Sequence, residues 1–273
     1  MVGEDALTTP LIPDLDEHHP VTSCDASETE RFAPGVVLLV VPAFNEEAAI
    51  RSTLCACLSI AAAEDILVVD DGSSDGTAAA VAALGVPCVR LPVNLGIGGA
   101  VQTGYRYAAR TKHLAVVQLD GDGQHDPRDL VRLVRPVLDG ACDMAVGSRY
   151  LNNDGYRSTL LRRLGSWLLS TALRISTGRR ILDCTSGFRA INRALVDVFV
   201  DYYPSDYPEP ESLAVLLHAG FRVVEVPVSM RQRAGGRSSI RPVDSVIYMA
   251  KLVSVIGAHW IAALPVTGGK RGR

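Results

Sequence analysis

Residues 36–47 read VVLLVVPAFNEE. Six consecutive valine and leucine residues lead into Pro42, a pattern that indicates a strand buried on both faces. Asn45 follows this strand directly, and it is predicted to cap an alanine-rich helix over residues 46–60. A buried strand, a polar turn and a helix in this order are typical of α/β proteins.

Strand and helix patterns alternate along the rest of the chain. Further strands are predicted at residues 65–70, 86–91, 113–119, 143–147 and 221–228. Further helices are predicted at residues 77–84, 98–109, 129–138 and 160–175. Because short connections join these elements, we expect an α/β fold with a mostly parallel sheet flanked by helices. The 273 residues are enough for one large domain of this kind.

Composition narrows the classes of function. The formal net charge of −3 argues against a nucleic-acid-binding protein that relies on a basic field. The six cysteines include no C-x-x-C pair, which favours reduced thiols in a cytoplasmic protein over a zinc site. Residues 1–34 are polar and acidic and are predicted to be a disordered lead, followed by one domain over residues 35–241.

The C-terminal region, residues 242–273, holds an apolar stretch interrupted by Asp244, Lys251 and His259. These interruptions argue against a simple membrane span. Two interpretations stay open, namely an amphipathic helix lying on the membrane surface and an ordinary packing helix.

Polar side chains gather where three predicted strands end, at residues 42–46, 70–75 and 120–124. The carboxyl ends of parallel strands meet at one edge of a sheet, so these clusters are expected to converge. Asp120 and Asp122 are like charges one residue apart, which repel unless a positive group lies between them. With Gln124 they offer the oxygen ligands that suit Mg²⁺ or Mn²⁺, although a polar turn with glycines is the simpler alternative.

Nucleotide and phosphate groups have candidate partners elsewhere. Glu46 and Asp71 can hydrogen-bond a base and a ribose, and the glycine-rich segment 94–100 opens a helix and can cradle a phosphate. Close packing of that helix on the sheet explains the same glycines equally well. We call residues 119–125, which contain Asp120 and Asp122, the acidic motif. The arginines that follow it in the sequence favour phosphate binding as a group. They are Arg149, Arg162, Arg163, Arg189, Arg231, Arg233 and Arg237, the last three in a glycine-hinged basic loop over residues 231–239.

Glu209 and Glu211 are candidate general bases for a hydroxyl acceptor. A phosphate monoester needs no base, since its second pKa near ~6 leaves it mostly dianionic at neutral pH. With such an acceptor, the two glutamates are interpreted as residues that cap a helix over residues 212–219.

Several motifs resemble those of family 2 glycosyltransferases with the GT-A fold, in the branch of dolichyl- and polyprenyl-phosphate mannose synthases. In chain order they are VPAFNEE (41–47), VVDDGSSDGT (68–77), NLG (94–96), LDGDGQH (119–125), GSRY (147–150) and TSGFRA (185–190). The resemblance runs from residue 36 to about residue 240, and it implies a Rossmann-like nucleotide-binding half followed by an acceptor half.

The resemblance implies a role for each matching residue. Asp120, Asp122 and Gln124 surround the metal, and Asp120, Asp122, Arg149 and Arg233 are the expected catalytic residues. The expected nucleotide-binding residues are Pro42, Ala43, Phe44, Glu46, Asp70, Asp71, Asn94, Gly98 and Asp120. The expected residues for the acceptor or its phosphate are Arg149, Arg162, Ser166, Arg189, Arg231, Arg233 and Ser238.

Three interpretations of function follow. The leading one is a metal-dependent, inverting glycosyltransferase that moves a hexose from a UDP-, GDP- or dTDP-linked donor to polyprenyl phosphate. It would act at the cytoplasmic face of the cell membrane in cell-envelope synthesis, brought there by the membrane surface or a membrane partner protein. The second is transfer to a hydroxyl acceptor with Glu209 or Glu211 as base. The third is a non-catalytic nucleotide-sugar-binding subunit. Formation of a homo-oligomer stays open.

Overall fold

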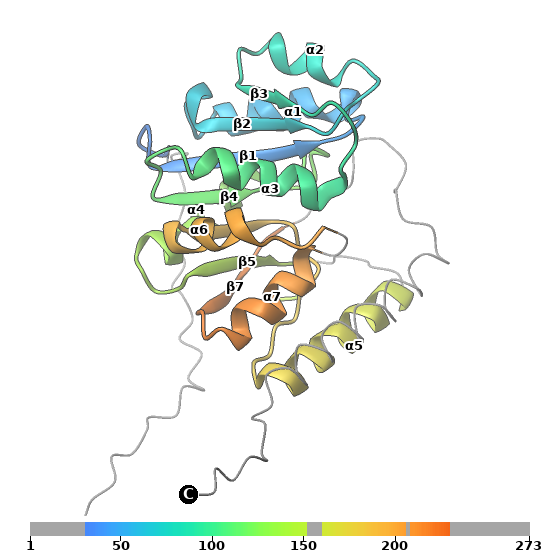
Figure 1. Cartoon of the computed structure of the whole chain (residues 1–273), viewed down its shortest axis with the longest axis vertical. Helices are drawn as coiled ribbons and strands as arrows, with labels where there is room; N and C mark the ends of the chain where they lie inside the picture. The colour runs from blue at the N-terminus through green and yellow to red at the C-terminus, as the bar shows by residue number, and fades with distance from the viewer. Residues whose placement is uncertain (1–30, 152–159, 206–207, 230–273) are drawn as a thin grey trace, which may run out of the picture.

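The computed structural model describes residues 31–151, 160–205 and 208–229 (Figure 1). The strands are β1 (Val37–Ala43), β2 (Ile66–Asp70), β3 (Cys88–Arg90), β4 (Ala115–Gln118), β5 (Met144–Ser148), β6 (Arg189–Asn192) and β7 (Val223–Pro227). The α-helices are α1 (Glu47–Leu58), α2 (Thr77–Ala82), α3 (Gly96–Ala108), α4 (Pro127–Leu138), α5 (Leu160–Thr177), α6 (Arg193–Asp201) and α7 (Pro208–His218). A 3-10 turn, η1 (Ala63–Asp65), precedes β2.

The seven strands form one sheet in the order β3-β2-β1-β4-β6-β5-β7. All neighbouring pairs are parallel except those that β6 makes with β4 and β5. The prediction of a mostly parallel sheet flanked by helices is confirmed.

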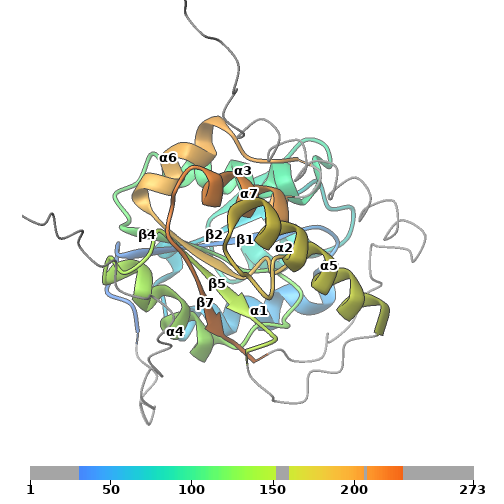
Figure 2. The same ribbon diagram turned by 90° about the horizontal axis from the view of Figure 1, so that it is seen from below.

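Helices cover both faces of this sheet (Figure 2). Leu39 and Val41 of β1 pack with α1, α2 and α4 in one core, whereas Leu38 and Val40 pack with α3, α5, α6 and α7 in the other. Alternate side chains of a strand point to opposite faces, so a strand covered on both faces needs an unbroken apolar run. All seven residues of β1 are buried, as the valine and leucine run predicted.

Asn45 does not cap α1, which corrects the prediction. Its backbone is left-handed, with φ of 54°, and its side-chain oxygen accepts from Ser74 N at 2.9 Å. The first amides of the helix bond instead to side chains of the turn after β2. Glu46 N donates to Thr77 Oγ1 at 2.9 Å, and Glu47 N donates to Asp75 Oδ2 at 3.2 Å. The N-terminus of α1 is therefore satisfied by tertiary contacts rather than by a local cap.

Two glycines of α3 allow close packing. A Cβ atom on Gly104 would collide with Val40 Cγ1 of β1. A Cβ atom on Gly98 would lie 2.5 Å from the backbone oxygens of Pro204 and Ser205, in the segment that follows α6. Gly98 and Gly104 are therefore both needed for close packing, and the phosphate-binding role of residues 94–100 stays a prediction.

The sequence pattern missed β6 and α6. β6 is only four residues long and runs antiparallel, and α6 starts immediately after it with Asn192 accepting from Leu195 N at 3.1 Å. The helix predicted over residues 212–219 begins earlier, at Pro208, and includes Glu209 and Glu211 in its first turn.

Three of the five cysteines that the structure describes belong to the core. Every cysteine that the structure describes is free, and Cys57, Cys142 and Cys184 are buried. Burial raises the pKa of the Cys184 thiol to about 12, so this residue is an inert part of the core rather than a reactive thiolate.

Phe32, which lies before the expected domain boundary at residue 35, also contacts the packed domain. Phe32 N donates to Ile60 O at 2.8 Å, and the Phe32 side chain packs against the core on the α1 face. Among the helices that the structure describes, none is both long enough and apolar enough to span a bilayer. The predicted surface or packing helix of residues 242–273 lies outside the described residues.

Candidate functional site

The three polar strand ends do converge. β1 lies between β2 and β4, and both pairings are parallel, so the segments that follow these strands leave the sheet at one edge. Asn45 N donates to Ser73 Oγ at 3.0 Å, which joins the first two segments. Thr53 Oγ1 of α1 donates to Gly121 O at 3.0 Å, which ties the third segment to the same region.

Asp70 and Asp71 organise the part of this edge that follows β2. Asp70 is fully buried, accepts from Ser73 N at 2.9 Å and lies 3.3 Å from Arg90 Nε. Asp71 accepts from Leu95 N at 2.7 Å and Gly96 N at 2.9 Å, at the start of α3. Burial raises the pKa of Asp71, while these two amides oppose the change. Asp70 therefore fixes the turn after β2, and Asp71 fixes the backbone at the start of α3.

The other predicted nucleotide-binding residues differ in exposure. Pro42 and Ala43 are buried at the end of β1, whereas Phe44 is 45% exposed and Asn94 is exposed. An aromatic ring and an amide at the rim are suited to contact a base and its ribose. Glu46 is partly buried beside them.

The acidic motif directly follows β4. The Asp120 side chain is 39% exposed, whereas Asp122 is buried and its Oδ1 accepts from Gln124 N at 3.1 Å. His125 Nε2 lies 3.8 Å from Asp120 Oδ2, and its ring stacks on Phe188 at 4.3 Å between centroids. Asp120 is thus accessible, while Asp122 is held by its own turn.

This donor set fits a divalent cation. Carboxylate and amide oxygens are hard ligands, and Mg²⁺ in substrate sites uses one or two carboxylates together with phosphate oxygens and water. Among the described residues, no group of three or more His, Cys, Asp or Glu side chains is placed to hold a metal ion.

A second group of site residues lies beside the acidic motif. It is positioned by residues 182–188, which lead into β6 and which we call the entry segment. A Cβ atom on Gly187 would lie 3.2 Å from Asp120 Oδ1, and Phe188 carries the ring that stacks on His125. Gly147 N of β5 donates to Phe188 O at 2.8 Å. The entry segment therefore contacts both the acidic motif and the end of β5.

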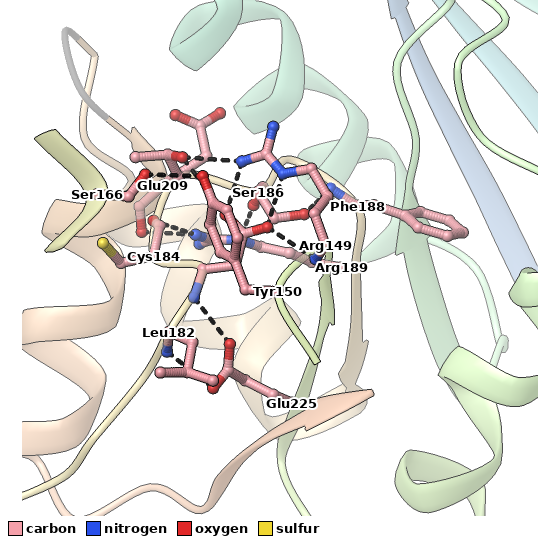
Figure 3. Close-up of polar contacts among 12 residues, drawn as sticks. Arg149, Tyr150, Ser166, Leu182, Cys184, Ser186, Phe188, Arg189, Glu209 and Glu225 are labelled. Carbon is pink, nitrogen blue, oxygen red and sulfur yellow. Dashed lines mark hydrogen bonds and ion pairs between the residues drawn. The ribbon is translucent and has the colours of Figure 1, made fainter. Parts of the chain in front are cut away.

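Arg149 follows β5 and is held by the entry segment (Figure 3). Its Nε and Nη2 donate to Asp183 Oδ2 and Oδ1, both at 2.6 Å, and Nη2 also donates to Thr185 Oγ1 at 3.0 Å. Tyr150 lies alongside, with its hydroxyl 3.1 Å from Ser166 Oγ of α5. Two of the residues predicted to bind the acceptor phosphate, Arg149 and Ser166, are thus brought together.

Arg189 is at odds with its predicted role as a phosphate contact. It is 1% exposed, and its guanidinium donates to four acceptors within the fold. These acceptors are Ser186 O at 2.7 Å, Ser212 Oγ at 2.8 Å, Cys184 O at 3.3 Å and Glu209 O at 2.7 Å. Arg189 therefore joins the entry segment to α7, and we assign it a structural role.

The two candidate bases lie in different surroundings. Burial raises the pKa of the Glu209 carboxyl, which also senses the charges of Arg189, Asp120 and Arg149. The Glu211 carboxylate accepts from the exposed Tyr202 hydroxyl at 2.8 Å. Of the two, Glu209 thus shares the electrostatic environment of the acidic motif.

Several predicted residues lie outside what the structure describes. They are Arg231, Arg233, Arg237 and Ser238, while Arg162 and Arg163 are described only as part of α5, without their side chains. Conversely, the sequence analysis missed Asp183 and Glu225. No sequence pattern marks them, since their roles depend on contacts with residues 34 and 43 positions away.

The sequence model of glycosyl transferase family 2 matches residues 38–199. Polyprenol monophosphomannose synthase of Mycolicibacterium smegmatis is 31% identical over 214 residues, which cover 74% of this chain and 80% of that protein. Undecaprenyl-phosphate mannosyltransferase of Micrococcus luteus is 31% identical over 213 residues, which cover 75% of this chain and 87% of that protein.

Among solved structures, glucosyl-3-phosphoglycerate synthase of Mycobacterium tuberculosis with Mn²⁺, UDP and glucosyl-3-phosphoglycerate superposes with a TM-score of 0.63. The match covers 92% of this chain and 88% of that one, at 24% sequence identity. This likeness confirms the predicted GT-A fold.

Arg189→Met should lower the free energy of unfolding by about 3 kcal/mol, because four buried acceptors lose their donor. Urea denaturation measures the change, and Arg110→Met is the control. Arg110 is exposed, and its loss should cost no more than about 0.5 kcal/mol. If Arg189→Met is as stable as the wild type and loses only acceptor binding, Arg189 binds the acceptor phosphate and the structural assignment is wrong.

Proposed function

Because the chain belongs to glycosyl transferase family 2, we propose that it transfers a hexose from a nucleotide-sugar donor to polyprenyl phosphate. One relative is named as a synthase of polyprenol monophosphomannose, and the other is named as an undecaprenyl-phosphate mannosyltransferase. Family membership together with the intact Asp120 and Asp122 argues against the non-catalytic interpretation.

One observation carries the choice of acceptor. The entry segment places Gly187 close to Asp120 and holds Arg149 through Asp183, so one segment connects a candidate anion-binding arginine to the acidic motif. A guanidinium binds phosphate oxygens through directed, charge-assisted hydrogen bonds. Ser166, hydrogen-bonded to Tyr150, adds a hydroxyl on the same side.

In this proposal the protein binds and orients the two substrates. Phe44, Asn94 and Asp71 contact the nucleoside of the donor, and Arg149 and Ser166 orient the acceptor phosphate toward the anomeric carbon. A phosphate oxygen attacks the anomeric carbon from the face opposite the nucleoside diphosphate, so the anomeric centre is inverted. The bond to the diphosphate breaks, and its electron pair leaves with the diphosphate. Asp120, Asp122 and Gln124 would hold Mg²⁺ or Mn²⁺, which would supply Lewis acidity to neutralise the leaving charge.

A hydroxyl acceptor is the second candidate, and the position of Glu209 is the observation that favours it. The charges of Asp120 and Arg149 act on the pKa of the buried Glu209 carboxyl, whereas Glu211 pairs with Tyr202. A hydroxyl must lose a proton as it attacks, so this acceptor requires Glu209 as base and a phosphate does not.

We also propose that α5 contacts the membrane that contains the acceptor lipid. Figures 1 and 2 both draw this helix at the rim of the molecule, projecting beyond the sheet. Three large apolar residues of α5 are exposed, namely Trp167 at 61%, Leu168 at 44% and Ile175 at 70%. Exposed arginines lie in the last turn of this helix and just after it, where anionic lipid headgroups would complement their charge. They are Arg174, Arg179 and Arg180.

Purified protein should transfer sugar from one member of a UDP-, GDP- and dTDP-sugar panel to polyprenyl phosphate when Mg²⁺ or Mn²⁺ is added. Asp120→Ala and Asp122→Ala should each lower the rate on the order of a hundredfold or more, because the oxygen ligands of the cation are lost. Asp139→Ala, an exposed aspartate just after α4, is the matched control. Absence of transfer and of donor binding across the panel would defeat the proposal.

Replacing each glutamate of α7 separates the two acceptors. With polyprenyl phosphate, Glu209→Gln and Glu211→Gln should both keep a rate near that of the wild type, because the acceptor is already ionised. A loss on the order of a hundredfold or more in Glu209→Gln alone would instead indicate a hydroxyl acceptor. The comparison uses initial rates at saturating donor.

Vesicles of phosphatidylcholine with phosphatidylglycerol as about one third of the lipid test the role of α5. Trp167→Ser should weaken cosedimentation on the order of tenfold, since a large apolar side chain no longer enters the interface. Leu114→Ser is the control, because Leu114 is equally exposed, at 62%, but precedes β4 at the opposite edge of the sheet. Unchanged binding by Trp167→Ser would assign membrane contact to another part of the chain.

A further inference from the structure

We propose that Glu225 is a positioning residue, which fixes the guanidinium of Arg149 for the acceptor phosphate by holding residues 182 and 183. This inference rests on the proposed function, in which Arg149 binds that phosphate. Glu225 itself does not contact Arg149 in any hydrogen bond that the described residues show, so its effect would pass through the entry segment.

The first step is the grip of Glu225 on the entry segment. Its Oε2 accepts from Leu182 N and its Oε1 accepts from Asp183 N, both at 2.8 Å. One carboxylate thus fixes two successive amides, which defines the position and direction of the backbone there. Glu225 lies on β7 and faces Val146 of β5 in the parallel pairing, so it is anchored to the strand that leads to Arg149.

The second step is the grip of Asp183 on Arg149. Asp183 is completely buried, and its Oδ2 accepts from the backbone N of Arg149 at 3.0 Å as well as from Nε. Together with the Nη2 contacts to Asp183 and Thr185, these bonds fix the plane of the guanidinium and therefore the direction in which Nη1 points.

Electrostatics supports a role in orientation rather than in affinity. Asp183 carries a negative charge next to the arginine that is proposed to bind a phosphate, so it opposes the attraction between them. Glu225 adds a second carboxyl in the same partly buried region, where burial raises its pKa. Two acidic groups next to Arg149 weaken its attraction for a phosphate. Phosphate transfer tolerates this loss only if the fixed orientation of the guanidinium contributes more than the attraction that is lost.

Glu225→Gln tests the first step with little change in shape. The amide keeps one acceptor oxygen, but its NH₂ group would face one of the two backbone N–H donors, so one bond to the entry segment is lost. Glu225→Ala is the second variant, in which both amides lose their acceptor. Asp197→Asn is the matched control, because Asp197 is exposed and pairs only at 3.7 Å with Arg193 on α6.

Steady-state kinetics separates positioning from a general loss of structure. In Glu225→Gln, the KM for polyprenyl phosphate should rise on the order of tenfold, the effect of one hydrogen bond, while the KM for the donor stays within about twofold. Damage to the fold alone would lower kcat through the active fraction and leave both KM values unchanged, and that result overturns the inference. So does an equal rise in both KM values.

A measurement without substrate keeps the inference separate from the proposed function. In ¹H–¹⁵N spectra of the free protein, the Arg149 Nε–H signal is identified by its absence in Arg149→Lys. Its exchange with solvent should accelerate on the order of tenfold in both Glu225 variants and stay unchanged in Asp197→Asn. If the wild type uses no polyprenyl phosphate, the proposed function fails, and this exchange rate alone decides the inference. Unchanged exchange in the Glu225 variants overturns it.

Discussion

The parallel pairing of β1 with both β2 and β4 is the constraint on which the site depends. It makes three chain segments leave the sheet at the same edge, although residues 42–46 and 120–124 lie far apart in the sequence. Helices cover both faces of β1, which favours an unbroken apolar run at this central position. The apolar run of β1 suits the centre of the sheet, and the parallel direction of β2 and β4 brings the acidic residues that follow them to one edge.

The antiparallel β6 supplies the other half of the site. β6 lies between β4 and β5 and runs against both, so its N-terminal end lies at the edge where those strands terminate. The entry segment before β6 consequently reaches the acidic motif through Gly187 and the end of β5 through Asp183. A parallel strand in this place would have sent the same residues to the opposite edge of the sheet.

Arg149 and Arg189 have different surroundings in the structure, although the sequence analysis predicted the same role for both. Arg149 and Arg189 both belong to motifs shared with the family, and both were predicted to bind phosphate. Arg149 is held in one plane by Asp183, next to Ser166, whereas Arg189 donates to backbone and side-chain oxygens of the entry segment and α7. A guanidinium has five donors, and how many the fold itself uses depends on neighbours that no local pattern reveals.

The sequence by itself determined the α/β class, the order of most strands and helices, and the three acidic or polar strand ends, because these follow from short-range hydrophobic patterns and from where strands stop. Only the tertiary structure decided how the N-terminus of α1 is satisfied, the direction of β6 and the different surroundings of Glu209 and Glu211. It also revealed Asp183 and Glu225 behind Arg149. Each of these depends on hydrogen bonds or burial between residues distant in the chain, and such contacts exist only after the sheet has brought them together.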